Sequence, residues 1–173
     1  MRRLMLGIIL LSWWAAAQDR PPDRWVDWQP LLGTWEGTGG GGSGQGSGSF
    51  TFTSELQGAV LVRHNYAQYP PTKDRPAYRH DDLMVIYPDA LSKKTRADYW
   101  DSEAHVIHYL VEFAEAGRRL VMTSDPSQPG PRYRLTYSKI GDNDLKLTFE
   151  IAPPNAPEKF ATYIEATAKR TEK

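Results

Sequence analysis

The residues best suited to chemistry stand together at the end of one expected strand. Tyr99 and Asp101 are two residues apart, which places them on the same face of a strand over residues 95–101. His105 follows directly after the tight turn Ser102-Glu103-Ala104. An imidazole beside a carboxylate can move a proton near neutral pH, although such pairs are also common for structural reasons. No GxSxG elbow accompanies the cluster, so we assign no catalytic residue.

Metal binding has weaker support in the sequence. His105 and His108 are three residues apart and so lie on opposite faces of a strand. No HxH or HExxH motif is present, and the absence of cysteine excludes thiolate ligands and disulfides. A metal site would need ligands from several strands, such as His80, Asp82, Asp101 and His105, and we predict none.

A glycine tract contains a GxGxxG pattern at Gly37, Gly39 and Gly42. In a dinucleotide-binding fold such glycines connect a strand to a helix whose N-terminus meets the pyrophosphate. Here the next segment, residues 50–53, alternates phenylalanine and threonine, which is a strand pattern. The tract is therefore expected to be a hairpin loop and not a nucleotide site.

Period-2 alternation and β-branched residues predict about ten strands and no helix longer than a turn or two. A short helical turn is expected around residues 27–32, where it could plug one end of a barrel. The expected strands cover residues 33–37, 50–53, 58–67, 83–87, 95–101, 106–113, 119–123, 132–138, 145–151 and 162–170.

Short turns between consecutive strands favour an all-β, up-and-down antiparallel barrel, because closure removes exposed edges. A β-sandwich is the alternative architecture. Ten strands would leave a lumen, since eight are about the number that side chains just fill. Proline-bearing loops over residues 70–76, 126–131 and 153–157 must lie outside the sheet. The first is the longest and is either a lid or a solvated connector.

Strand parity predicts an interior of apolar side chains and tyrosine hydroxyls. Such a cavity suits a small apolar or amphipathic ligand. We predict no cofactor. On strand 58–67 the inward face is ambiguous, because Arg63 and Asn65 could replace His64 and Tyr66 there. The polar ligand-binding candidates are His64, Tyr66, Tyr99, His105, Tyr109 and Tyr133. The expected interior residues are Phe50, Phe52, Val60, Val62, Tyr99, Ile107, Tyr109, Tyr133, Tyr137 and Phe149.

The triplet Gly33-Thr34-Trp35 resembles the Gly-x-Trp signature of lipocalin-type barrels, and residues 31–37 resemble the entry of nitrobindin-like barrels. In lipocalins the tryptophan closes the barrel floor and an arginine of the last strand packs over it. The resemblance therefore implies structural roles for Trp35 and Arg170, which has inward parity. The mature chain also resembles an uncharacterised bacterial family of exported lipocalin-like proteins. The residues that carry this wider resemblance are 56–58, 80–83, 99–101, 105–107 and 150–153.

Nitrobindin-like barrels hold ferric haem through a histidine near the C-terminal end. This chain has no histidine after His108. Tyr163 is the remaining haem-ligand candidate in the last strand, and its parity points outward. The resemblance therefore does not extend to haem, and no cofactor is predicted.

The N-terminal residues predict an export signal. Arg2 and Arg3 precede an apolar run over residues 4–14 and the small residues Ala15-Ala16-Ala17, so cleavage is expected after Ala17. The run is shorter than the roughly 17–25 residues that a spanning helix needs. We therefore divide the chain into a signal peptide (1–17), a lead (18–30) and a barrel (31–170).

The charge balance and the expected location of the protein narrow its possible functions further. The 21 basic and 21 acidic residues balance, so the chain has no basic excess for nucleic acid or for an anionic membrane. The mature chain is expected in the periplasm or outside the cell. The most economical function is binding of a small ligand in the lumen. The alternatives are an enzyme using the cluster of Tyr99, Asp101 and His105, and a filled barrel acting as an envelope interaction protein. The oligomeric state is not encoded in these patterns.

Overall fold

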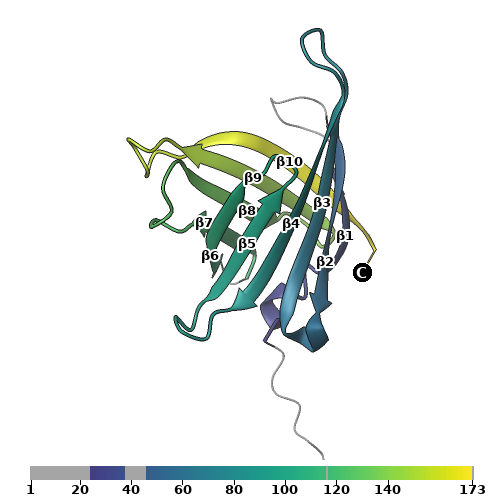
Figure 1. Ribbon diagram of the computed structural model, residues 1–173. Coiled ribbons are helices and arrows are strands. Elements are labelled where there is room, and N and C mark those ends of the chain that lie inside the picture. Colours follow the sequence, from purple (N-terminus) through teal and green to yellow (C-terminus); the bar gives the residue numbers. More distant parts are fainter. Residues whose placement is uncertain (1–23, 38–45, 116, 173) are drawn as a thin grey trace, which may run out of the picture.

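The chain forms a closed barrel of ten antiparallel strands (Figure 1). Our computed structural model describes residues 24–37, 46–115 and 117–172. Each strand pairs with its neighbour along the chain, and β1 pairs with β10 to close the ring. This confirms the predicted barrel and excludes the sandwich. The strands are β1 (Gly33–Gly37), β2 (Ser47–Glu55), β3 (Val60–Tyr69), β4 (Tyr78–Pro88), β5 (Thr95–Asp101), β6 (Val106–Ala114), β7 (Arg119–Ser124), β8 (Arg132–Lys139), β9 (Asp144–Ala152) and β10 (Ala161–Glu172).

One end of the barrel is closed by the segment before β1. A 3-10 turn, η1 (Val26–Trp28), lies there, slightly earlier in the chain than the predicted turn. Trp25 and Trp28 are buried and meet edge to face, with ring centroids 5.9 Å apart. Trp28 also packs edge-on against Phe113 at 5.2 Å. The indole of Trp25 donates to the carbonyl of Gly58 at 2.8 Å, so its polar atom is satisfied despite burial.

The first and last strands meet at the same closed end. Trp35 of β1 is almost fully buried, and its indole donates to the carbonyl of Leu31 at 2.9 Å. The guanidinium carbon of Arg170 lies 4.2 Å from the centroid of the Trp35 ring, within cation–π range. Arg170 also donates to the carbonyls of Leu32 and Pro30. These contacts tie β10 to the chain segment that precedes β1.

The inward face of β3 differs from the expected one. Leu61 is fully buried and Arg63 nearly so, while Val60 and Val62 are only half-buried on the outer face. The expected inward placement of the two valines was wrong. The segment Val60-Leu61-Val62 is apolar on both faces, so alternation alone does not fix which side meets the core. The cross-strand register does, since Arg63 lies between Phe52 and the buried Met84.

The three proline-bearing loops all connect strands at the other, open end of the barrel. The β3–β4 connection is the longest, and the hairpin extends well beyond the ring in Figure 1. Its base is held by stacking of Tyr69 on Tyr78, with ring centroids 4.6 Å apart, and Arg75 covers the Tyr78 ring at 4.0 Å.

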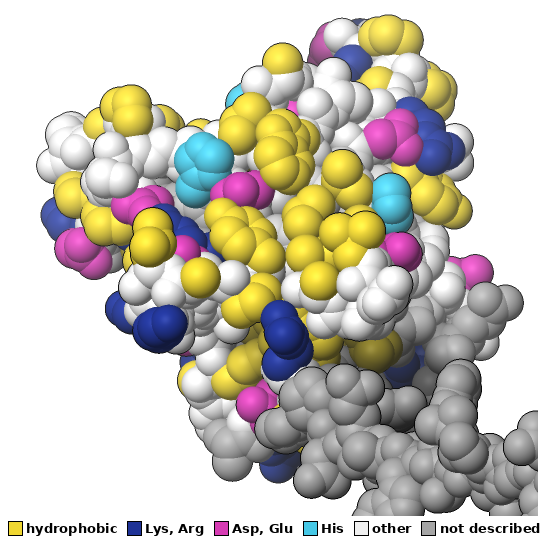
Figure 2. Space-filling model, turned by 60° about the horizontal axis from the view of Figure 1, so that its bottom comes forward, with side chains coloured by type: hydrophobic (Ala, Val, Ile, Leu, Met, Phe, Trp, Pro, Cys, Tyr) yellow, Lys and Arg dark blue, Asp and Glu magenta, His cyan; other side chains and the backbone are white. Residues whose placement is uncertain are grey.

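The outer wall is not uniformly polar. Leu83, Trp100 and Val106 pair side by side across β4, β5 and β6, and Trp100 and Val106 are exposed. Figure 2, seen from the lower end, shows hydrophobic side chains gathered between charged ones on this side of the molecule.

Two sequence features lie outside the described residues. They are the expected signal peptide (1–17) and the glycines Gly39 and Gly42 of the tract between β1 and β2. Within the described residues, no helix is sufficiently long and apolar to span a membrane.

Candidate functional site

A cavity of about 400 Å³ lies inside the barrel toward its open end. This volume falls within the range of small-molecule sites. The two sides of the cavity differ in chemistry. Strands β6, β8, β9 and β10 contribute an apolar wall, and strands β3, β4 and β5 contribute a polar one. The apolar wall includes Ile107, Leu135, Leu147, Phe149, Ile164 and Ala166; the polar wall includes Arg63, Asn65, His80, Asp82, Tyr99 and Asp101.

The deepest part of the polar wall is a buried ion pair. Arg63 Nη1 donates to Asp82 Oδ1 at 2.6 Å, and both side chains are about 5% exposed or less. Asn65 donates to the other Asp82 oxygen at 2.7 Å. Burial is the largest single influence and lowers the pKa of the Arg63 guanidinium, but Asp82 and the neighbouring tyrosines together outweigh it, so that pKa is raised. Arg63 Nε is buried and has no protein partner. The cavity therefore contains a fixed, incompletely satisfied donor group.

His80 connects this pair to the cavity mouth. Its Nδ1 lies 3.2 Å from Glu103 Oε1, and its Nε2 lies 3.2 Å from the Tyr99 hydroxyl and 3.4 Å from Asp82 Oδ2. Since the Tyr99 hydroxyl donates its proton to Asp101, both imidazole nitrogens must act as donors. The hydrogen bond to Asp82 raises the pKa of His80, burial lowers it, and the hydrogen bond to Glu103 raises it again. The net result is a pKa of about 9. His80 is therefore an imidazolium at neutral pH.

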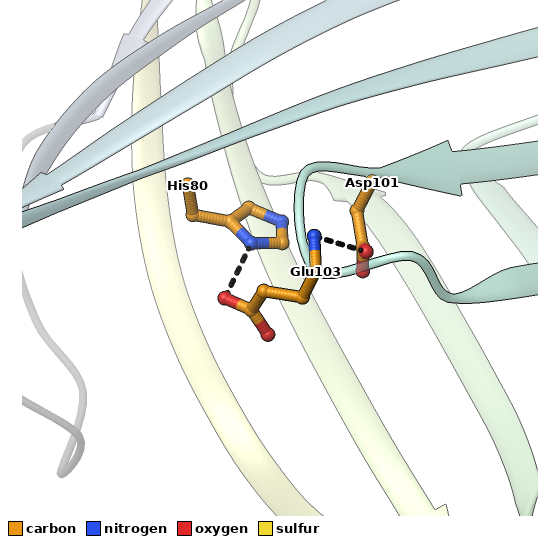
Figure 3. Close-up of side chains that lie close together, drawn as sticks. All are labelled: His80, Asp101 and Glu103. Atoms are coloured by element: carbon orange, nitrogen blue, oxygen red, sulfur yellow. Dashed lines mark hydrogen bonds and ion pairs between the residues drawn. The ribbon is translucent and has the colours of Figure 1, made fainter.

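The turn after β5 fixes Asp101. Its Oδ1 accepts the backbone N–H groups of Glu103 and His105, both at 2.9 Å. Its Oδ2 lies 2.8 Å from His105 Nδ1 and accepts the Tyr99 hydroxyl at 3.2 Å. Burial alone would raise the pKa of Asp101, but these hydrogen bonds outweigh it and lower that pKa. Figure 3 shows His80 and Glu103 pointing toward each other beside Asp101.

The hydroxyls of Tyr99 and Tyr109 in the cavity wall stay protonated at neutral pH. Burial, assisted by the nearby carboxylates, raises the pKa of Tyr99, and burial raises that of Tyr109 as well. At neutral pH these side chains therefore offer hydrogen bonds and do not act as bases. The arrangement can orient a polar group on a ligand whose remainder contacts the apolar wall.

The cavity brings together four of the six predicted binding residues: Tyr99, His105, Tyr109 and Tyr133. The other two lie on the outer face: His64 is exposed in a groove beside Leu83 and Trp100, and the Tyr66 ring lies under the guanidinium of Arg79. The register of β3 turns Arg63 and Asn65 inward in place of His64 and Tyr66. This is the alternative that the sequence left open.

Sequence reasoning did not select His80 or Glu103 as binding residues. Strand β4 begins at Tyr78, five residues before the expected start, and this extension carries His80 to the mouth. The extension is charged on both faces, with the exposed Arg79–Asp81 pair outside and His80 and Asp82 inside. Period-2 alternation of charged residues was the signal that could have revealed it.

The residues at the cavity do not fit a haem. The two imidazoles that border it are engaged by carboxylates, His80 by Asp82 and Glu103 and His105 by Asp101. Tyr163, expected on the outer face, lies at a register shift of β10, exposed at the mouth with its ring edge-on to Phe149. The shift interrupts alternation, which is why parity misplaced the ring.

No protein-family description matches this chain, and a search of curated proteins finds no match either. The lipocalin-like resemblance is therefore supported at the level of the closed antiparallel barrel, and the narrower family assignments remain proposals.

Proposed function

We propose that the protein is an exported, lipocalin-like carrier that binds a small amphipathic molecule in the lumen of its barrel. The observation that supports this most strongly is the two-sided cavity of about 400 Å³. An apolar wall supplies affinity, because burial contributes roughly 25 cal/mol per Å² of apolar surface. The opposite wall supplies orientation through groups whose positions are already fixed by hydrogen bonds. Export rests on the composition of residues 1–17.

The two alternatives have less support. A barrel that acts through its surface alone would be packed solid, whereas this one leaves space beside Leu147 and Phe149. An enzyme using Tyr99, Asp101 and His105 would need a base with a free lone pair at the substrate. His105 Nδ1 is directed at Asp101, and the remaining Nε2 lone pair belongs to a side chain that is 58% exposed, whereas a general base is tuned in a site that excludes water.

Filling the cavity tests the proposal. Ala166 of β10 lines the apolar wall, and Ala166→Trp would occupy space that a ligand needs. The matched control is Glu165→Trp on the neighbouring outward position, which removes only an exposed ion pair with Lys146. We expect the apolar dye N-phenyl-1-naphthylamine to bind the wild type and Glu165→Trp saturably at one site, and Ala166→Trp at least about tenfold more weakly. Equal binding by both variants would place the dye outside the lumen and refute the proposal.

A further inference from the structure

The cavity mouth gathers side chains of the types that bind divalent metal ions. His80 comes from β4, Asp101 from the end of β5, and Glu103 from the turn that follows (Figure 3). One donor atom from each lies within 4.8 Å of the other two. Asp101 and Glu103 are held near each other by the hydrogen bond from the Glu103 N–H to Asp101 Oδ1. Three ligands, one imidazole and two carboxylates, therefore converge from two strands and a turn.

One of the three distances between the donor atoms matches a tetrahedral site, and the other two are at most 4.8 Å. With zinc–ligand bonds of about 2.0–2.2 Å, adjacent ligand atoms in a tetrahedron lie roughly 3.3–3.6 Å apart. His80 Nδ1 and Glu103 Oε1 are 3.2 Å apart, close to that separation. The Glu103 side chain is half-exposed on its turn. It can therefore shift by the small amount that brings the set around one ion without moving a strand.

The surroundings hold the carboxylate of Asp101 in place. Its Oδ1 is fixed by two backbone N–H groups, and its Oδ2 would exchange the long 3.2 Å hydrogen bond from Tyr99 for the ion. His105 Nδ1 contacts Oδ2 at 2.8 Å and lies 3.9 Å from Glu103 Oε2. Such outer partners fix the orientation of ligating groups and strengthen metal binding. His105 is thus a positioning residue for the carboxylates and not one of the three ligands.

We infer that His80, Asp101 and Glu103 bind one Zn²⁺ ion, which displaces a proton from the His80 imidazolium to solvent, with the fourth coordination position open toward the cavity. One imidazole and two carboxylates suit a borderline ion such as Zn²⁺ better than Mg²⁺, which prefers octahedral oxygen ligands and keeps its waters. Since His80, Asp101 and Glu103 all line the cavity, the open position faces the space assigned to the organic ligand. The inference goes beyond the proposed carrier function, because the ion can bind without the organic ligand in the lumen.

The chain supplies a matched control on its outer wall. His108 Nδ1 lies 2.6 Å from Asp98 Oδ1, a histidine–carboxylate pair much like those at the mouth. The other Asp98 oxygen accepts the hydroxyl of Tyr87 at 3.1 Å. A pair of this kind has too few ligands for tight binding of Zn²⁺. Removing His108 therefore removes an exposed histidine without affecting the proposed site.

The test is calorimetric titration of chelator-treated protein with zinc chloride. We expect one site per chain in the wild type and in His108→Ala, with affinity lowered by more than about tenfold in His80→Ala and Glu103→Gln. Magnesium chloride should give no comparable binding. Glu103→Gln keeps the backbone N–H that holds Asp101, so it reports on the ligand with the turn intact. Absence of a zinc site in the wild type, or equal affinity in Glu103→Gln and wild type, would overturn the inference.

A second readout is the visible spectrum with Co²⁺ in place of Zn²⁺. Four-coordinate Co²⁺ gives intense ligand-field bands, which we expect in the wild type and His108→Ala and not in His80→Ala. Bands of equal intensity in His80→Ala would contradict the assignment. The dye test of the lumen is run on chelator-treated protein, so loss of zinc binding and loss of ligand binding are observed separately.

Discussion

The two ends of the barrel use aromatic residues in opposite ways. At the closed end, Trp25, Trp28 and Trp35 are all buried, and each indole contributes mainly apolar contact area. At the open end, tyrosines take the place of tryptophans and stand among histidines and carboxylates that line a cavity. One end gains stability from close packing, and the other leaves space and keeps buried polar groups.

The comparison indicates where stability and binding reside. Burying a charged group is costly unless it is paired, and a cavity removes packing contacts. Both costs are concentrated on the open half, around the Arg63–Asp82 pair. The tryptophan end must offset them, so the chain separates a stabilising region from a binding region. Substitutions in the two regions should therefore have different consequences.

The largest effect is expected from Trp28→Ala at the closed end. Trp28 is 3% exposed and packs against Phe113, so its removal should lower the free energy of unfolding by about 4 kcal/mol. Tyr69→Ala at the open end removes one half-buried stacking contact and should cost about 1 kcal/mol. Urea denaturation measures both. Similar losses for the two variants would break the distinction between the ends.

Arg63→Leu should have the next largest effect, about 3 kcal/mol, because the buried Asp82 carboxylate then keeps only Asn65 and the more distant His80 as partners. The comparison variant is Arg79→Leu, which breaks the exposed pair with Asp81 on the outer face of β4. It should cost less than about 1 kcal/mol. Thermal and urea unfolding of the two variants gives the difference. The double variant Arg63→Leu/Asp82→Leu should recover part of the loss, and failure to recover would argue against the unpaired charge as its cause.

Arg170→Ala tests the junction of the first and last strands. It removes the guanidinium from the Trp35 ring and from the carbonyls of Leu32 and Pro30, so a loss of about 2 kcal/mol is expected. Lys169→Ala, at the adjacent exposed position, should change stability by less than about 0.5 kcal/mol. Denaturation curves that do not separate these neighbours would show that the stacking contributes nothing measurable.

The smallest effect concerns pH and the open end. The pKa of His80 is raised from 6.5 to about 9 in the folded, metal-free chain. A raised folded-state pKa adds stability that is complete below about pH 6.5 and is lost as the pH rises toward 9. The loss should be on the order of 1 kcal/mol, since His80 is partly exposed. The wild type should show this decline relative to His80→Gln in the presence of chelator, and parallel pH profiles would exclude it.

Much of the barrel could be predicted from the sequence. Strand number and order follow from period-2 alternation and the turns, because a single closed sheet leaves few ways to connect neighbours. The placement of Phe50, Tyr99 and Tyr109 on the interior follows from the same alternation, since each strand has only one strongly apolar face there.

The remaining features depend on contacts that local patterns do not encode. Strand β3 has apolar residues on both faces around Leu61, so only its pairing with β2 and β4 determines which side faces inward. The first half of β4 has charges on both faces, which hid His80 from a search for apolar alternation. The register shift at Tyr163 adds a residue that no alternation rule predicts. Polar cavity walls are thus harder to predict from sequence than apolar cores.

The pairing of β1 with β10 also bears on how the chain folds. The side chain of Arg170 reaches carbonyls 138 and 140 residues earlier in the sequence. Contacts between such distant residues require closure of a long loop, which slows folding and leaves edges unprotected meanwhile. During synthesis β1 has one edge without its partner until β10 has been made. A truncated product would therefore be an open sheet prone to association.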